Sequence, residues 1–140
     1  MLELRHVVPG VVDARRVGVV DMSSDRYAGQ DTADKVRFWS PEAQVEVMAP
    51  DTPAGGKWDL VIIIHDGLMY QRGRRLLRVV KTQLSNTPLV VTFDLCFQRA
   101  WRIDRNGYGA FSRRAWAYPY LLAVVRRLPA PLRRPLLGTR

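Results

Sequence analysis

The sequence has a single cysteine, Cys96, and only two histidines, His6 and His65. One cysteine excludes an internal disulfide and is typical of a protein in a reducing compartment. The cysteine and the two histidines do not have the close spacing of metal ligands. The sequence therefore predicts no metal site.

Long hydrophobic runs are absent as well. No stretch approaches the roughly 20 apolar residues that cross a bilayer, and the first residues lack the basic-then-apolar order of a signal peptide. We therefore expect a cytoplasmic protein with no membrane span. With 140 residues, of which 47% are hydrophobic, the chain can form one domain with a buried core.

Acidic residues are nearly missing from the last third of the chain. Residues 99–140 carry ten arginines and one acid, Asp104, whereas residues 1–98 carry 12 basic and 12 acidic residues. The net charge of +9 therefore belongs to the C-terminal segment alone. We divide the chain into a core, residues 1–98, and a basic, aromatic-rich extension, residues 99–140.

The most informative stretch that is present is the apolar run of residues 60–64, which His65, Asp66 and Gly67 follow. The run is too rich in β-branched residues for a helix and predicts a parallel strand, residues 59–66, buried on both faces. Alternation of strands and helices with short turns predicts a mostly parallel α/β sheet with flanking helices. The other predicted elements are strands over residues 17–20, 43–48 and 89–93 and helices over residues 25–39 and 68–85.

For the extension we predict a helix over residues 120–128 and no regular structure beyond it, because prolines 129, 131 and 135 follow. Its mixture of arginines and aromatics has two interpretations: binding of phosphates and bases, or a cap whose aromatics cover the sheet. We favour the cap. The side chains expected to be buried by it are Trp101, Phe111, Trp116 and Tyr120.

Three aspartates, Asp21, Asp51 and Asp66, each follow a predicted strand. Open α/β sheets bind ligands beyond the carboxyl ends of their strands, so we expect these carboxylates to converge there. An acid in such a position can accept hydrogen bonds from both ribose hydroxyls of a nucleotide. The alternative is that each aspartate only stabilises a turn or a helix N-terminus, as we also expect of Ser23 and Ser24.

The segments around these acids resemble class I S-adenosylmethionine-dependent methyltransferases. Residues 17–23 are similar to the family's second strand, residues 45–51 to its third, and residues 58–70 to its fourth strand and substrate-facing loop. Residues 76–93 resemble the next helix and strand, and residues 108–114 resemble a late segment of small-molecule members. The resemblance implies a Rossmann-like fold with S-adenosylmethionine as cofactor.

The resemblance also implies roles for individual residues. Asp21, with Met22 beside it, would bind the cofactor's ribose, and Asp51 would bind its adenine. His65 and Asp66 would face a small-molecule acceptor. A histidine there can act as a general base or orient a nucleophile, or it can simply be a satisfied polar group in the core.

The family's first strand and glycine-rich loop have no clear counterpart, because residues 1–10 offer only Pro9-Gly10. That strand lies between the second and the fourth, so its loss would leave a gap in the sheet, with unpaired backbone groups. Either residues 2–8 fill the position, or the chain is a divergent or truncated relative with an incomplete sheet, or a partner chain completes it.

We therefore expect a methyltransferase-like protein that acts on a small molecule, or a relative that has lost this activity. The alternative is a non-enzymatic protein that binds RNA or a partner chain through the arginines of residues 99–140. A serine hydrolase of the GDSL type, which Asp21-Met22-Ser23 faintly resembles, is excluded. Its triad needs a histidine late in the chain, and no histidine follows His65.

Overall fold

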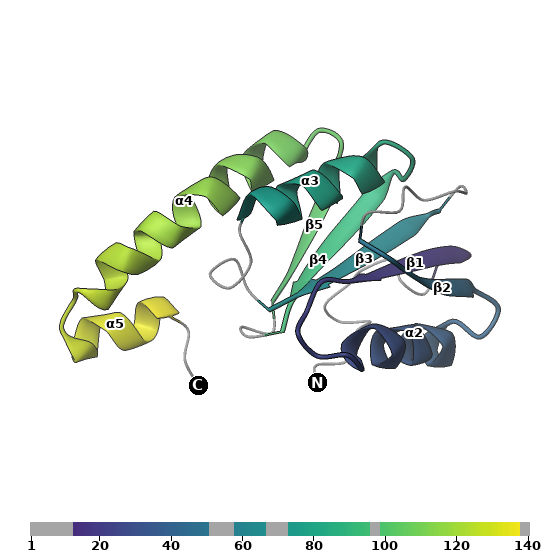
Figure 1. Cartoon of the computed structure of the whole chain (residues 1–140), viewed down its shortest axis with the longest axis horizontal. Coiled ribbons are helices and arrows are strands. Elements are labelled where there is room, and N and C mark those ends of the chain that lie inside the picture. The colour runs from purple at the N-terminus through teal and green to yellow at the C-terminus, as the bar shows by residue number, and fades with distance from the viewer. Residues whose placement is uncertain (1–12, 51–57, 67–72, 96–98, 138–140) are drawn as a thin grey trace.

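The computed structural model describes residues 13–50, 58–66, 73–95 and 99–137 (Figure 1). These residues form one sheet and four helices. The strands are β1 (Arg16–Asp21), β2 (Gln44–Met48), β3 (Leu60–His65), β4 (Leu89–Asp94) and β5 (Arg99–Asp104). The helices are α2 (Ala28–Trp39), α3 (Gly73–Leu84), α4 (Tyr108–Arg126) and α5 (Ala130–Leu137).

The strands lie in the order β2-β1-β3-β4-β5. The first four are parallel, and β5 is antiparallel to β4. The predicted mostly parallel α/β sheet with flanking helices is therefore confirmed. The division of the chain at residue 98 separates β4 from β5, which are neighbours in this sheet.

The predicted gap in the sheet is wrong. β1 pairs directly with β3, from Val17 opposite Leu60 to Asp21 opposite Ile64. No further strand fits between them, because their backbone groups already bond to each other. Neither a strand from residues 2–8 nor a partner chain is needed at this position.

Helices cover both faces of the sheet (Figure 1). The side chains of β3 alternate between the faces, as a period of two requires. Leu60, Ile62 and Ile64 pack in the cluster that contains Val36 of α2, and Val61 and Ile63 pack in the cluster on the α3 side. Every residue of β3 is buried, so the predicted strand with two covered faces is confirmed.

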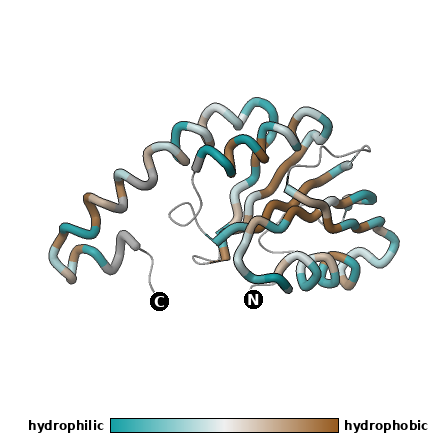
Figure 2. The backbone as a smooth tube through the Cα atoms, in the orientation of Figure 1, coloured by the Kyte–Doolittle hydropathy of each residue, from teal (hydrophilic) through white to brown (hydrophobic). Residues whose placement is uncertain are grey.

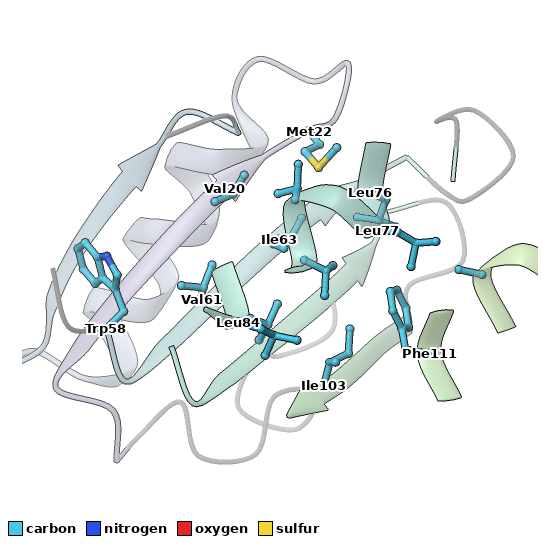
Figure 3. Packing of buried hydrophobic residues seen from close by; sticks show 14 residues of the cluster. Val20, Met22, Trp58, Val61, Ile63, Leu76, Leu77, Leu84, Ile103 and Phe111 are labelled. Atoms are coloured by element: carbon cyan, nitrogen blue, oxygen red, sulfur yellow. The ribbon is translucent and has the colours of Figure 1, made fainter. Parts of the chain in front are cut away.

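The α3 side of the core includes residues from the C-terminal segment (Figure 3). Ile103 of β5 and Phe111 of α4 pack against Leu77 and the other apolar residues of α3. The rings of Trp101 and Phe111 lie 5.9 Å apart, centroid to centroid. Residues 99–115 thus complete the hydrophobic core of residues 1–98.

The predicted cap is wrong for two of its four aromatics. Phe111 is only 4% exposed, whereas Trp116 is 47% and Tyr120 71% exposed. The reason is the direction of α4, which leaves the sheet after its first turns (Figure 1). Only the first part of the helix therefore acts as a cover.

The C-terminal helices also differ from the prediction. α4 begins at Tyr108 and continues through position 119, so the predicted helix over residues 120–128 is only its second half. α5 contradicts the expectation that no regular structure follows. Pro131 lies in the first turn of α5, where a helix does not need the N–H that proline lacks. Within the part of the chain that the structure describes, no helix has the length and apolar character to cross a membrane.

Candidate functional site

The carboxyl ends of the neighbouring strands β1 and β3 lie side by side, and the connections that follow these two strands go to opposite faces of the sheet. After β1 the chain passes to α2 on one face, and after β3 it passes to α3 on the other (Figure 1). Such a switch point is where open α/β sheets bind ligands. Asp21 ends β1, and His65 and Asp66 end β3, so the structure brings these three residues to one edge. Asp51 lies outside the described residues.

Asp21 uses both carboxylate oxygens within its own chain. Its Oδ1 accepts hydrogen bonds from the Ser23 N–H at 2.8 Å and the Ser23 hydroxyl at 2.6 Å, and its Oδ2 accepts one from the Gly29 N–H at 2.8 Å. The backbone of Gly29 lies close to the Asp21 side chain, since a Cβ on Gly29 would lie 3.0 Å from the Cβ of Asp21. The carboxylate therefore stabilises the N-terminus of α2 from the end of the neighbouring strand.

Ser23 and Ser24 are not the N-caps that the sequence predicts. α2 begins at Ala28, its N-cap position is Tyr27, and no side chain bonds to the helix from that position. Because the helix starts after Ser24, the two serines form the connecting loop instead. The Ser23 hydroxyl donates to Asp21, as described above, and the Ser24 N–H donates to Asp66 Oδ2 at 2.7 Å.

Asp66 therefore links the end of β3 to the loop that follows β1. In the same loop the Met22 N–H donates to the Ile64 carbonyl at 2.8 Å, which extends the pairing of the two strands. The Met22 side chain is buried in the α3-side cluster together with Leu76 (Figure 3). Only the backbone of Met22 thus lies at the edge where the cofactor was expected.

His65 is buried at the end of β3, on the face that Ile63 shares. Its partner in the register is Asp94, the last residue of β4. Burial lowers the pKa of His65, and the negative charges of Asp94 and Asp66 act in the opposite direction. The imidazole is therefore neutral at pH 7, the form in which a histidine can accept a proton.

Asp94 is a candidate site residue that the sequence analysis did not name. It is half-buried, opposite His65 in the sheet. The signal was available, since Asp94 follows an apolar strand just as Asp21 and Asp66 do. It was missed because the resemblance assigns no role to that position.

An open depression among the described residues lies at the opposite end of the strands. Asp13, Ala14 and Arg15 line it before β1, together with Trp39 at the end of α2 and the four residues that follow it. It contains neither Asp21 nor His65. Among the residues that the structure describes, no group of three or more histidines, cysteines or carboxylates is arranged to hold a metal ion.

Comparisons with models of known protein families, with curated proteins and with solved structures find no match to this chain.

Replacing Asp21 with alanine is expected to lower the free energy of unfolding by about 2 kcal/mol, because the Ser23 and Gly29 donors lose a charged acceptor. Urea unfolding of the whole protein measures this. The control is Asp34→Ala, since Asp34 forms an exposed ion pair with Arg37 that is worth less than about 1 kcal/mol. Equal small losses in both variants would show that Asp21 does not stabilise α2.

The lowered pKa of His65 makes stability depend on pH in a defined window. The folded pKa lies below the ordinary value of 6.5, so the unfolded chain takes up the proton first as the pH falls. Stability should be complete above pH 6.5 and fall below it, by up to about 1.4 kcal/mol per pH unit. Urea unfolding at a series of pH values measures the slope. His65→Gln should flatten it; equal slopes in the wild type and this variant would contradict the assignment.

Proposed function

We propose that this chain is a divergent, methyltransferase-like α/β protein that binds a small molecule at the carboxyl edge and has lost S-adenosylmethionine-dependent activity. A Rossmann-like fold is part of the proposal. It is supported by four adjacent parallel strands in the order β2-β1-β3-β4 and by helices on both faces, as in doubly wound sheets. The observation that carries the functional proposal is the Asp21 carboxylate, whose two oxygens are bonded within its own chain.

The described residues do not fit S-adenosylmethionine in the way that the resemblance implies. Ribose hydroxyls would have to compete with the Ser23 and Gly29 donors for Asp21. The Met22 side chain is occupied in the core. The direct pairing of β1 and β3 leaves no position for the strand that precedes the family's glycine-rich loop. We therefore derive no methyl-transfer step.

The chemistry of the other polar groups at the edge, Asp66, Asp94 and His65, favours a ligand that donates hydrogen bonds. Asp66 and Asp94 are half-buried, and the buried His65 directly precedes Asp66 in the chain and lies opposite Asp94 in the register. Asp66 already accepts a hydrogen bond from the Ser24 N–H, so a ligand would use the remaining acceptor capacity of these carboxylates. Carboxylates accept hydrogen bonds, and a neutral imidazole can accept or donate one. Hydroxyl- or amine-bearing small molecules suit this set of groups.

Two titrations test the two halves of this proposal. Calorimetry with S-adenosylmethionine and its demethylated product is expected to give no heat at millimolar ligand. Saturation-transfer NMR with a polyol and a diamine, ribose and putrescine, is expected to detect binding that Asp94→Asn weakens and Asp34→Asn does not. Saturable heat that Asp21→Asn abolishes would restore the cofactor, and no transfer to either probe would contradict the small-molecule site.

The second candidate is non-enzymatic RNA binding, which the exposure of Arg113, Arg114, Arg126 and Arg127 favours. Each phosphate neutralised by an arginine makes affinity fall with salt. Deleting residues 126–140 should then flatten the salt dependence in a gel-shift assay. This candidate does not account for the apolar side chains between the two arginine pairs.

A further inference from the structure

The second half of α4, together with α5, forms a helical arm, defined here as residues 116–137. α4 packs on the core through Phe111 and Ala115 and then extends away from the sheet, and α5 turns back beside its end (Figure 1). Among the arm residues whose side chains the structure describes (116, 117, 120, 121 and 123–133), none is a buried core residue. These side chains are therefore not part of the domain's own core.

The arm exposes an apolar face. Trp116, Tyr120 and Val124 follow one another at four-residue spacing, which aligns them on one side of a helix, and Leu121 lies beside them. Tyr120, Leu121 and Val124 are 71%, 57% and 61% exposed. Hydrophobic residues thus gather along the outer half of α4 as well as in the central strands (Figure 2). Leu132 of α5 is exposed too.

Arginines stand at both ends of this apolar face. Arg113 comes three residues before Trp116 and Arg127 three residues after Val124, so helical spacing places both near the same side. Both side chains are exposed. No acidic residue follows Asp104 in the sequence, so nothing in the arm offsets their charge.

We infer that the arm docks on an anionic lipid surface, with its apolar face in the membrane interface and its arginines on the lipid phosphates. The charge favours anionic headgroups at about 1 kcal/mol per arginine near the surface. The tryptophan and tyrosine have the mixed apolar and polar character that membrane interfaces select. RNA fits less well, because Leu121 and Val124 offer nothing to phosphates or stacked bases.

The arm lies in the plane of the interface and does not span the bilayer. Eleven residues, 115–125, separate the two arginine pairs, and a helix of that length covers about 16 Å. A bilayer core is about 30 Å thick. Arginines at both ends of so short a segment can keep both ends at the headgroups while the apolar residues between them lie in the interface.

Vesicle flotation of the full chain tests the inference. The wild-type protein should float with phosphatidylcholine vesicles that contain phosphatidylglycerol and not with phosphatidylcholine alone. The double variants Leu121→Ser/Val124→Ser and Arg126→Gln/Arg127→Gln should each bind the anionic vesicles about thirtyfold more weakly. The matched control is Phe38→Ser, which removes a 73% exposed aromatic from α2 and should bind like the wild type.

Circular dichroism of each variant shows whether it still folds, which is expected because every substituted residue is exposed. A blue shift of tryptophan emission on vesicles, absent from Trp116→Phe, would place the arm at the lipid. Three results would overturn the inference: no flotation of the wild type, flotation that the apolar variant retains, or retention of RNA at physiological salt without vesicle binding. A dimer that the apolar variant loses, with no vesicle binding, would assign the face to a second copy and would overturn it as well.

Discussion

Ile62→Ala and Ile63→Ala are each expected to lower the free energy of unfolding by about 2–5 kcal/mol. Both side chains are fully buried in the central strand β3, but they belong to different clusters. Ile62 packs on the α2 side and Ile63 on the α3 side. Each truncation therefore leaves a cavity in a separate half of the core.

Urea unfolding measures both losses, and Val47→Ala on the edge strand β2 is the control. Val47 is exposed, so its truncation should cost less than about 1 kcal/mol. Large losses for both isoleucines would support a sheet covered on both faces. A small loss for either one would mean that its face of the sheet is open to solvent.

Phe111→Ala is expected to cost about 3–5 kcal/mol, and Trp116→Ala less than about 1 kcal/mol. Phe111 is buried and lies against Trp101 and Ile103 of β5. Trp116 is half exposed, and its one described ring contact is with Arg74, whose Cζ lies 5.1 Å from the ring centroid. A cation–π contact at such a site is worth little.

Thermal melts and urea unfolding of the two variants give this comparison directly. The larger loss at Phe111 would locate the point where α4 ceases to cover the sheet, between Ala115 and Trp116. A larger loss at Trp116 would mean that the arm packs on the domain. It would then also remove the exposed face on which membrane docking depends.

Four of the five described strands could be predicted because their signal is local, whereas β5 (Arg99–Asp104), with its charged residues, was not predicted. Residues 60–64 form a continuous apolar run rich in β-branched residues, and residues 17–20 and 89–93 form shorter runs of the same kind. Each of these predicted ranges therefore agrees closely with an observed strand. Short connections between them favour a parallel sheet with helical crossovers. The order of the strands is not local. Whether β1 pairs with β3 depends on which side of the sheet each crossover takes, and a gap was predicted where none exists.

The candidate site, too, could be predicted only as far as its signal is local. That Asp21 and Asp66 lie at one edge follows from their positions after parallel strands. The hydrogen bonds that they accept there could not be predicted in this way. The Gly29 donor is eight residues from Asp21, and the Ser24 donor lies in the loop after β1, whereas Asp66 follows β3. Likewise, the aromatics of the extension are visible in the sequence. Which of them is buried depends on where α4 leaves the sheet, and Trp116 and Tyr120 lie beyond that point.

The central claim is that the Asp21 carboxylate is bound by its own chain and is not available to a cofactor. Amide NMR during a titration with S-adenosylmethionine tests it most directly, because the Ser23 and Gly29 N–H groups report on the hydrogen bonds to Asp21. We expect both amide resonances to stay in place up to millimolar ligand in the wild-type protein and to move in Asp21→Asn without any ligand. Saturable shifts of both resonances on addition of S-adenosylmethionine to the wild type would contradict the account.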